Sequence, residues 1–150
     1  MKIKMLSFYL FTVVFSANVF AGDSINIPQK VYRLFHNAFP EVKNESWYKS
    51  PDTYEAYFKN VDSSSCKIYY SRDGKLLSTL KYYFGNALPL FIRIKVAEKY
   101  AGRNIFGVIE IYANNKTIYC IMLEDNRKWY KVKSDINGNI TLDETLIKAS

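Results

Sequence analysis

The sequence predicts an α+β fold in which tandem helix-plus-four-strand repeats form one antiparallel curved sheet with two helices on one face. Two segments place apolar residues at helical spacing, and the segments that follow each of them alternate apolar and polar residues, as half-buried strands do. The order of a helical segment, alternating segments and a glycine turn occurs twice. We therefore place repeat one at about 28–84 and repeat two at about 88–148.

The stretch 54–83 predicts a three-strand meander with one apolar face. Tyr54, Ala56 and Phe58 alternate with more polar residues, and two further alternating runs follow. Gly74 lies between these two runs, where it supplies the positive φ that a tight hairpin turn requires. A meander with one apolar face is not stable alone, so we expect other elements to cover that face.

Two helices are expected to provide this cover. The first begins at Pro28, a residue that suits the first turn of a helix, and ends before Pro40, which cannot continue one. The second runs from residue 88 or 89 to Tyr100 and has a broad apolar side, as a helix packed on a sheet requires.

The second half of the chain repeats the pattern of the first with an offset of 64 or 65 residues. Alternating runs between residues 106 and 146 predict four more strands, separated by turns rich in Asn, Asp and Gly. Matched positions include Phe35 and Tyr100, Trp47 and Tyr112, Tyr54 and Tyr119, Phe58 and Leu123, and Gly74 and Gly138.

Residues 1–21 predict a secretory signal peptide. Lys2 and Lys4 precede an almost wholly apolar run that is too short to span a bilayer, and small residues lead up to Ala21. We expect a single domain at 22–150, located in the periplasm or secreted, with no membrane span in the mature chain.

The charge of the chain does not indicate nucleic-acid binding. The formal charge is +7, and it falls to +5 without residues 1–21, which contain two lysines and no acid. The basic residues do not cluster on a helix or form an RNA-binding strand motif, so a nucleic-acid partner is not expected.

Strand parity argues against a disulfide between Cys66 and Cys120, although export would permit one. Cys66 shares the parity of residues assigned to the inner face, whereas Cys120 has the opposite parity to its apolar neighbours. Side chains on opposite faces of a sheet do not reach disulfide geometry. A one-residue bulge would reverse this argument.

Four short motifs resemble those of the PepSY-like family of exported proteins, which are also described as similar to beta-lactamase inhibitor protein. They are Phe39-Pro40 at a helix end, Trp47, the aromatic strand Tyr54 to Phe58, and the turn Asp73-Gly74. The resemblance implies tandem helix-and-four-strand units, export and a non-catalytic role. No residues match an inhibitory loop, so inhibition of a beta-lactamase is not implied.

No catalytic or metal-binding constellation is recognisable, so we do not expect an enzyme. His36 is the single histidine and lies off the apolar stripe of its helix, without a nucleophile nearby in sequence. Glu55 and Glu110 lie on predicted strand faces beside aromatic residues. The acidic turns lack the glycine spacing of a calcium loop, and no phosphate loop or zinc spacing is present, so no cofactor or metal is expected.

The unusual feature is the number of aromatic residues: 13 Tyr, 10 Phe and 2 Trp. Parity places several of them with lysines on the sheet face that points away from the helices, an arrangement typical of protein-binding surfaces but also of ordinary exposed strands. The candidate binding residues are Tyr57, Lys67, Tyr69, Tyr112, Trp129 and Lys131. The favoured function is non-enzymatic binding of an unidentified periplasmic protein or peptide. The alternative is carriage of a small ligand or metal in a helix–sheet cleft.

Overall fold

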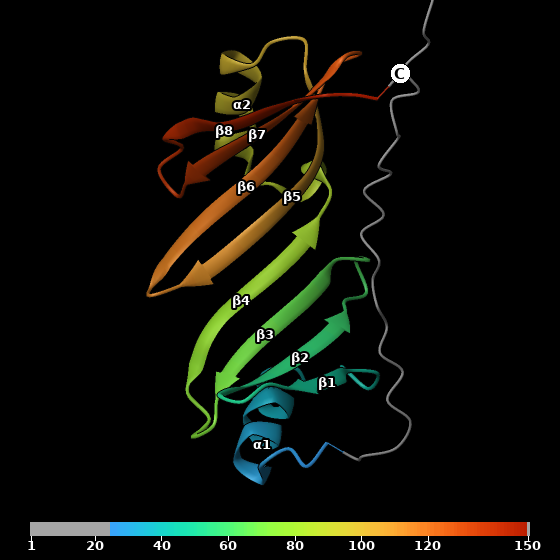
Figure 1. Ribbon diagram of the computed structural model, residues 1–150, viewed down its shortest axis with the longest axis vertical. Coiled ribbons are helices and arrows are strands. Elements are labelled where there is room, and N and C mark those ends of the chain that lie inside the picture. Colours follow the sequence, from blue (N-terminus) through green and yellow to red (C-terminus); the bar gives the residue numbers. More distant parts are fainter. Residues whose placement is uncertain (1–24, 150) are drawn as a thin grey trace, which may run out of the picture.

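The fold is a single antiparallel sheet of eight strands in sequence order, with a helix at each end (Figure 1). The computed structural model describes residues 25–149; the predicted signal peptide lies outside them. The elements are α1 (Gln29–Ala38), β1 (Ser46–Lys49), β2 (Thr53–Lys59), β3 (Ser65–Ser71), β4 (Leu76–Tyr83), η1 (Gly85–Ala87), α2 (Leu90–Lys99), β5 (Asn104–Ala113), β6 (Lys116–Glu124), β7 (Lys128–Asp135) and β8 (Ile140–Ile147). The α+β class, the single sheet and the two helices agree with the prediction from the sequence.

Each helix starts directly after a proline, as the sequence indicates. Pro28 and Pro89 precede α1 and α2, and their carbonyl oxygens accept the first helical hydrogen bonds, at 3.1 and 3.0 Å. Phe39 and Tyr100 end the two helices. The helices therefore correspond at an offset of 61 residues, and Tyr100 takes the position of Phe39 rather than that of Phe35. The expected offset is wrong in the helices because the segments between helix and strands differ in length.

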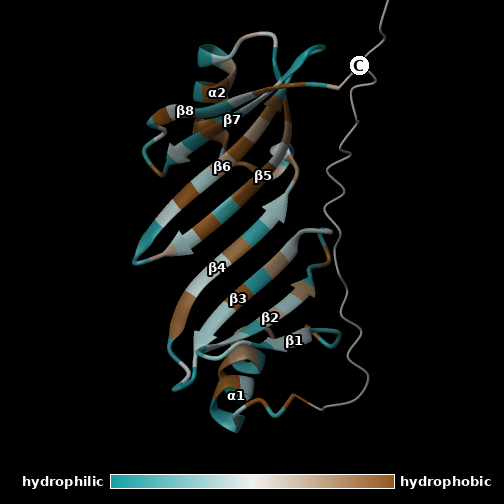
Figure 2. Ribbon diagram, in the orientation of Figure 1, coloured by the Kyte–Doolittle hydropathy of each residue, from teal (hydrophilic) through white to brown (hydrophobic). Residues whose placement is uncertain are grey.

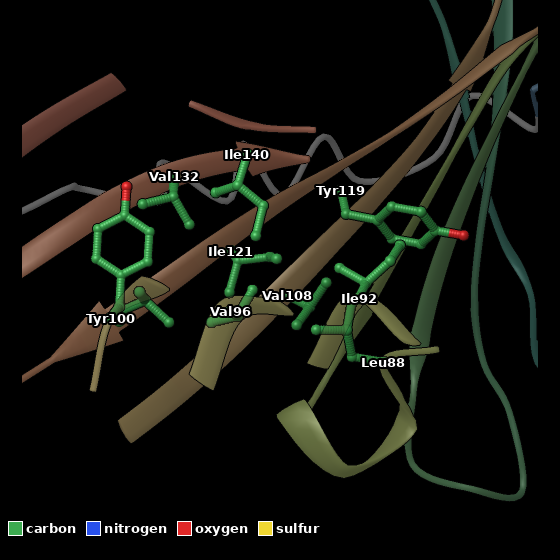
Figure 3. Close-up of a cluster of buried hydrophobic side chains, with 10 residues drawn as sticks. Leu88, Ile92, Val96, Tyr100, Val108, Tyr119, Ile121, Val132 and Ile140 are labelled. Atoms are coloured by element: carbon green, nitrogen blue, oxygen red, sulfur yellow. The ribbon is translucent and has the colours of Figure 1, made fainter. Parts of the chain in front are cut away.

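Each helix covers its own hydrophobic core. The first core joins Val31 and Phe35 of α1 to residues of β2 and β3, and the rings of Phe39, Trp47 and Phe58 surround Phe35 at 5.3–5.4 Å from ring to ring. In the second core Ile92 and Val96 of α2 face the strands β5, β6 and β7 (Figure 3). The second core contains Leu88, Ile92, Val96, Tyr100, Val108, Tyr119, Ile121, Leu123, Val132 and Ile140.

Both cores lie on the same face of the sheet, which we call the inner face. Residues directly opposite each other in neighbouring strands share a face. Ile68 of the first core is opposite Thr79 of β4, and Thr79 is opposite Tyr112 of β5. Val108 of the second core lies four positions before Tyr112 in β5, so it is on the same face as Ile68. The other face, which we call the outer face, carries no helix formed by residues 25–149.

A bulge in β5 reverses the parity that the sequence suggests for that strand. Ile105 is opposite Leu123, but the next opposed pair is Gly107 and Met122, so one extra residue, Phe106, is inserted. The insertion turns Val108 into the second core, where it is 3% exposed (Figure 3). It also turns Tyr112 to the inner face, so the prediction that Tyr112 lies on the outer face is wrong.

The prediction that Cys66 and Cys120 lie on opposite faces of the sheet is confirmed. Cys66 lies on the inner face beside the first core, and Cys120 lies on the outer face, opposite Lys133 and Ile109. Both thiols are free in the structure. Over residues 25–149, neither helix has the length and apolar character needed to cross a membrane.

A turn glycine packs against each helix. A Cβ on Gly74 would lie 3.4–3.5 Å from side-chain atoms of Lys30 and Leu34, and one on Gly138 would lie 2.7–3.1 Å from Lys95 and Phe91. Both glycines have positive φ, at 84° and 74°. The helix positions involved are again 61 residues apart, so the two helices sit on their hairpins in the same way.

Candidate functional site

The outer face carries five of the six residues proposed from the sequence, in two separate groups. Tyr57 is opposite Lys67 in the β2–β3 pair, and Tyr69 follows two positions after Lys67 on the same face. Trp129 and Lys131 lie on the outer face of β7. The two groups are separated by β4, β5 and β6, and Tyr112 belongs to the opposite face.

The strands between these groups carry apolar side chains on the outer face, a feature that sequence reasoning missed. The register places them in a continuous row across β4, β5 and β6, and Figure 2 shows hydrophobic segments along these strands. We call this set the central patch: Leu80, Tyr82, Ile109, Ile111, Ile118 and Met122. Simple alternation along β5 predicts that Ile109 and Ile111 are buried, which is wrong. A glycine within a strand, here Gly107, is the sequence signal that indicates a bulge.

A groove of about 410 Å³ opens beside the central patch. Its lining includes Tyr82, Phe84, Phe106, Ile109, Met122 and Lys131. Phe106, the bulge residue, is 55% exposed and packs edge-on against Trp129 with the ring centres 4.8 Å apart. The bulge therefore has two effects: it directs an aromatic ring outward and it places isoleucines on the outer face.

Three lysines of the outer face are paired with acids on neighbouring strands. Lys67 lies 2.9 Å from Glu55, and this hydrogen bond raises the pKa of the Lys67 ammonium. Lys131 lies 3.4 Å from Glu144 and Lys133 lies 2.9 Å from Asp143. The charge of these three lysines is thus balanced locally, although the whole chain is basic.

Burial also raises the pKa of Tyr69, and Glu55 adds to this effect. Tyr69 therefore stays neutral and keeps its hydroxyl as a hydrogen-bond donor at physiological pH. Such a side chain combines a large apolar area with one polar contact, the combination that is frequent at the centres of protein interfaces.

Two side chains that could be reactive, those of Cys120 and His36, lie apart in β6 and α1. Burial raises the pKa of the Cys120 thiol, which keeps it protonated and a weak nucleophile. Nε2 of His36 lies 3.0 Å from Oε1 of Glu45, and the same oxygen accepts a 3.4 Å hydrogen bond from Trp47. Within residues 25–149 no three His, Cys, Asp or Glu side chains gather as a metal site.

Several solved structures from Bacteroides species share this fold. A BLIP-like protein from Bacteroides fragilis matches with a TM-score of 0.64 and 15% identity, over 83% of this chain and 92% of that one. A DUF2874 family protein from Bacteroides ovatus matches with a TM-score of 0.63 and 18% identity, over 84% and 89% of the two chains. A protein described as periplasmic from Bacteroides eggerthii matches with a TM-score of 0.62 and 12% identity, over 81% and 89%.

At these identities the likeness concerns the fold: the chain has the BLIP-like fold. No protein-family model matches the sequence, and no curated protein matches it either. None of these structural neighbours is described as PepSY-like, so that resemblance remains a prediction.

Proposed function

We propose that the chain is a non-enzymatic periplasmic protein that binds another protein or a peptide through its outer sheet face. The observation that carries the proposal is the central patch, a row of apolar side chains that no element of residues 25–149 covers. Contiguous apolar surface on a soluble protein commonly marks an interaction site. The BLIP-like fold of the neighbours supports a binding role without identifying the partner.

The composition of the face suggests how binding energy would be distributed. Leu80, Ile109 and Ile111 supply the apolar centre, and Tyr69 and Trp129 lie on either side of it. Anchors of this kind each contribute roughly 2 kcal/mol or more when a partner excludes water from them. The paired lysines form a rim that contributes less, because exposed ion pairs are worth about 0–1 kcal/mol.

The test compares variants on the two faces of the sheet. The immobilised chain captures proteins from a periplasmic extract, the bound proteins are identified, and each is then titrated against Tyr69→Ala, Ile111→Lys and Tyr112→Ala. Tyr112 is the matched control, because it is a half-buried tyrosine on the opposite face. We expect both outer-face variants to weaken binding at least tenfold, about 1.4 kcal/mol, while Tyr112→Ala keeps its affinity.

Equal loss in Tyr112→Ala and Tyr69→Ala would show that the outer face is not the binding surface. The proposal would also be wrong if none of the three substitutions changed the affinity for any captured protein.

A second candidate function is carriage of a small acid, and one hollow favours it. This hollow, of about 670 Å³, lies between α2 and the start of β5 and is lined by Arg93, Val96, Ala97, Arg103 and Ile105. The buried Nε of Arg103 has no hydrogen-bond partner within residues 25–149, although it lies 4.0 Å from Oδ2 of Asp125. Native mass spectrometry of the purified protein tests this function, because a carried acid adds its mass to the monomer and Arg103→Met removes it.

Three finer predictions belong with the proposal. The two halves would descend from one duplicated unit, which the shared contacts of Gly74 and Gly138 support. Kinship with the PepSY-like proteins would account for the motifs around Trp47. Location in the periplasm requires cleavage of the predicted signal peptide, which N-terminal sequencing of the exported protein tests.

A further inference from the structure

The side of α2 that faces away from the sheet is apolar. Leu90, Phe91 and Ile94 are 61%, 53% and 49% exposed, and they lie within about 100° of one another around the helix, away from its two buried positions. The β7–β8 turn, which packs on this helix, adds Ile136, and this side chain is 62% exposed. We call these residues the apolar tip: Leu90, Phe91, Ile94 and Ile136.

Basic side chains border the apolar tip on both sides of the helix. Arg93 lies about 60° beyond Leu90 around the helix axis. Lys95 lies about 40° beyond Phe91 in the other direction, and Lys99 lies about 40° further. Nζ of Lys95 lies 4.6 Å from the centre of the Phe91 ring, so its stem covers apolar surface while the ammonium stays at the border. Within residues 25–149, none of these three cations forms an ion pair with a carboxylate.

The fold itself does not require the apolar tip. α1 covers the first core in the same way, with the same two positions buried and the same contact to a turn glycine. The equivalent positions of α1 and of its hairpin turn are all polar: Gln29, Lys30, Arg33 and Arg72. The exposed large apolar residues of α1, Tyr32 and Leu34, take the positions of the two cations that border the tip in α2. The outward pattern of α2 is therefore the reverse of that of α1 and needs its own explanation.

We infer that the apolar tip enters the headgroup region of an anionic lipid surface, where the bordering cations contact the lipid phosphates. The charge of the tip's border carries this choice of partner, because an apolar centre between cations complements a layer of phosphates that covers hydrocarbon. Lys95 and Lys99 donate hydrogen bonds to the carbonyl oxygens of Asn137 and Ile140, at 3.3 and 2.6 Å, and an ammonium group can donate further bonds to phosphate. The single acid of α2, Glu98, lies in its last turn, so the first two turns are the part that enters the lipid.

The size of the apolar tip fits shallow insertion. Its side chains expose on the order of 300 Å² of apolar surface, well below the roughly 800 Å² per partner of a stable protein complex. Side chains that insert into lipid need no shaped partner surface, since each contributes through its own area and the cations add to it. We expect reversible binding that weakens as salt screens the cations. The helices lie on the inner face of the sheet, so the outer face stays accessible in the bound protein.

The test is flotation of the chain from residue 22 onward with vesicles of phosphatidylcholine alone or with about one third phosphatidylglycerol. The native chain should float with the anionic vesicles and stay in solution with the neutral ones. The triple variant Leu90→Gln/Phe91→Lys/Ile94→Arg gives α2 the outward residues of α1 and two more positive charges. It should bind at least roughly tenfold more weakly, whereas attraction by charge alone would make it bind more tightly. Arg93→Gln and Lys99→Gln should each weaken binding roughly fivefold. Circular dichroism checks that each variant is folded.

A fluorescence measurement identifies the side of the molecule that meets the lipid. Brominated acyl chains should quench the fluorescence added by Ile94→Trp, because this position enters the lipid. The native chain is the control, since Trp47 packs in the first core and Trp129 lies on the outer face. Ile111→Lys, on the outer face, should bind the vesicles as the native chain does.

Three results would overturn the inference. The native chain could stay in solution with the anionic vesicles at low salt, and a dimer that the triple variant loses would then assign the tip to a second copy. The triple variant could bind as tightly as the native chain, which would leave no role for apolar insertion. Brominated lipid could quench the native tryptophans as strongly as it quenches Ile94→Trp, which would place the outer face against the lipid.

Discussion

The bulge in β5 leads to a direct prediction about which residues of that strand support the fold. Val108 is 3% exposed in the second core, and Ile111 is half-buried on the outer face. Replacing Val108 with lysine removes about 1.5–3 kcal/mol of apolar burial and forces an ammonium group into the core, so we expect a loss of at least about 3 kcal/mol. The same substitution at Ile111 leaves the ammonium in water and should cost about 1 kcal/mol.

Urea unfolding followed by tryptophan fluorescence measures the difference. With a slope of about 1–3 kcal/mol per molar urea, Val108→Lys should lower the midpoint by at least about 1 M and Ile111→Lys by no more than about 1 M. Trp47 and Trp129 report on opposite halves of the sheet. If Ile111→Lys proves the more damaging variant, β5 has no bulge, and both the central patch and the placement of Tyr112 are wrong.

Two further predictions concern acid stability and turn geometry. The hydrogen bond from Tyr130, at 2.7 Å, and then the backbone N–H of Arg127 lower the pKa of Asp125 from 3.8 to about 2. A carboxyl group whose pKa is lowered by folding stabilises the protein above its ordinary pKa, and this contribution is lost as the pH falls through the folded value. Asp125→Asn should therefore lower the melting temperature at neutral pH, and the difference from the native chain should shrink between pH 4 and pH 2; a constant difference would contradict this cause. Gly102→Ala and Gly138→Ala both place a side chain at positive φ, near 75°, but only Gly138 meets α2. Chemical denaturation should show a loss of about 1 kcal/mol for Gly102→Ala and about 2–3 kcal/mol for Gly138→Ala, and equal losses would contradict the packing of Gly138 on α2.

Most of the fold could be predicted from local patterns. The alternation of Tyr54, Ala56 and Phe58 identifies a strand and its buried face, because one side of the sheet lies against a helix. Pro28 and Pro40 delimit α1 for reasons of backbone chemistry alone. The two cysteines could be assigned to opposite faces, because the inserted residues near them lie in the neighbouring strands β4 and β5 and leave the alternation of β3 and β6 intact.

The candidate site was harder to predict from the sequence, because the face on which its residues lie depends on one inserted residue. Alternation indicates that Ile109 and Ile111 share a face, but it does not indicate which face that is. The insertion of Phe106 shifts the register of β5 against β6 and so decides which face Ile109 and Ile111 occupy. This register is a property of the paired strands and not of the sequence of β5 alone. The pairing of Lys67 with Glu55 likewise needs the register, since the two residues belong to different strands.

The separation of the two cores has a consequence for how the chain acquires its structure. All members of the first core lie between Val31 and Tyr70, and all members of the second lie between Leu88 and Ile140. Every strand also pairs with its neighbour in sequence. Contacts this local favour rapid folding. The N-terminal half can consequently fold around Phe35 before the C-terminal half has been synthesised. The free edge of β4 is then available to pair with β5 as the C-terminal half folds.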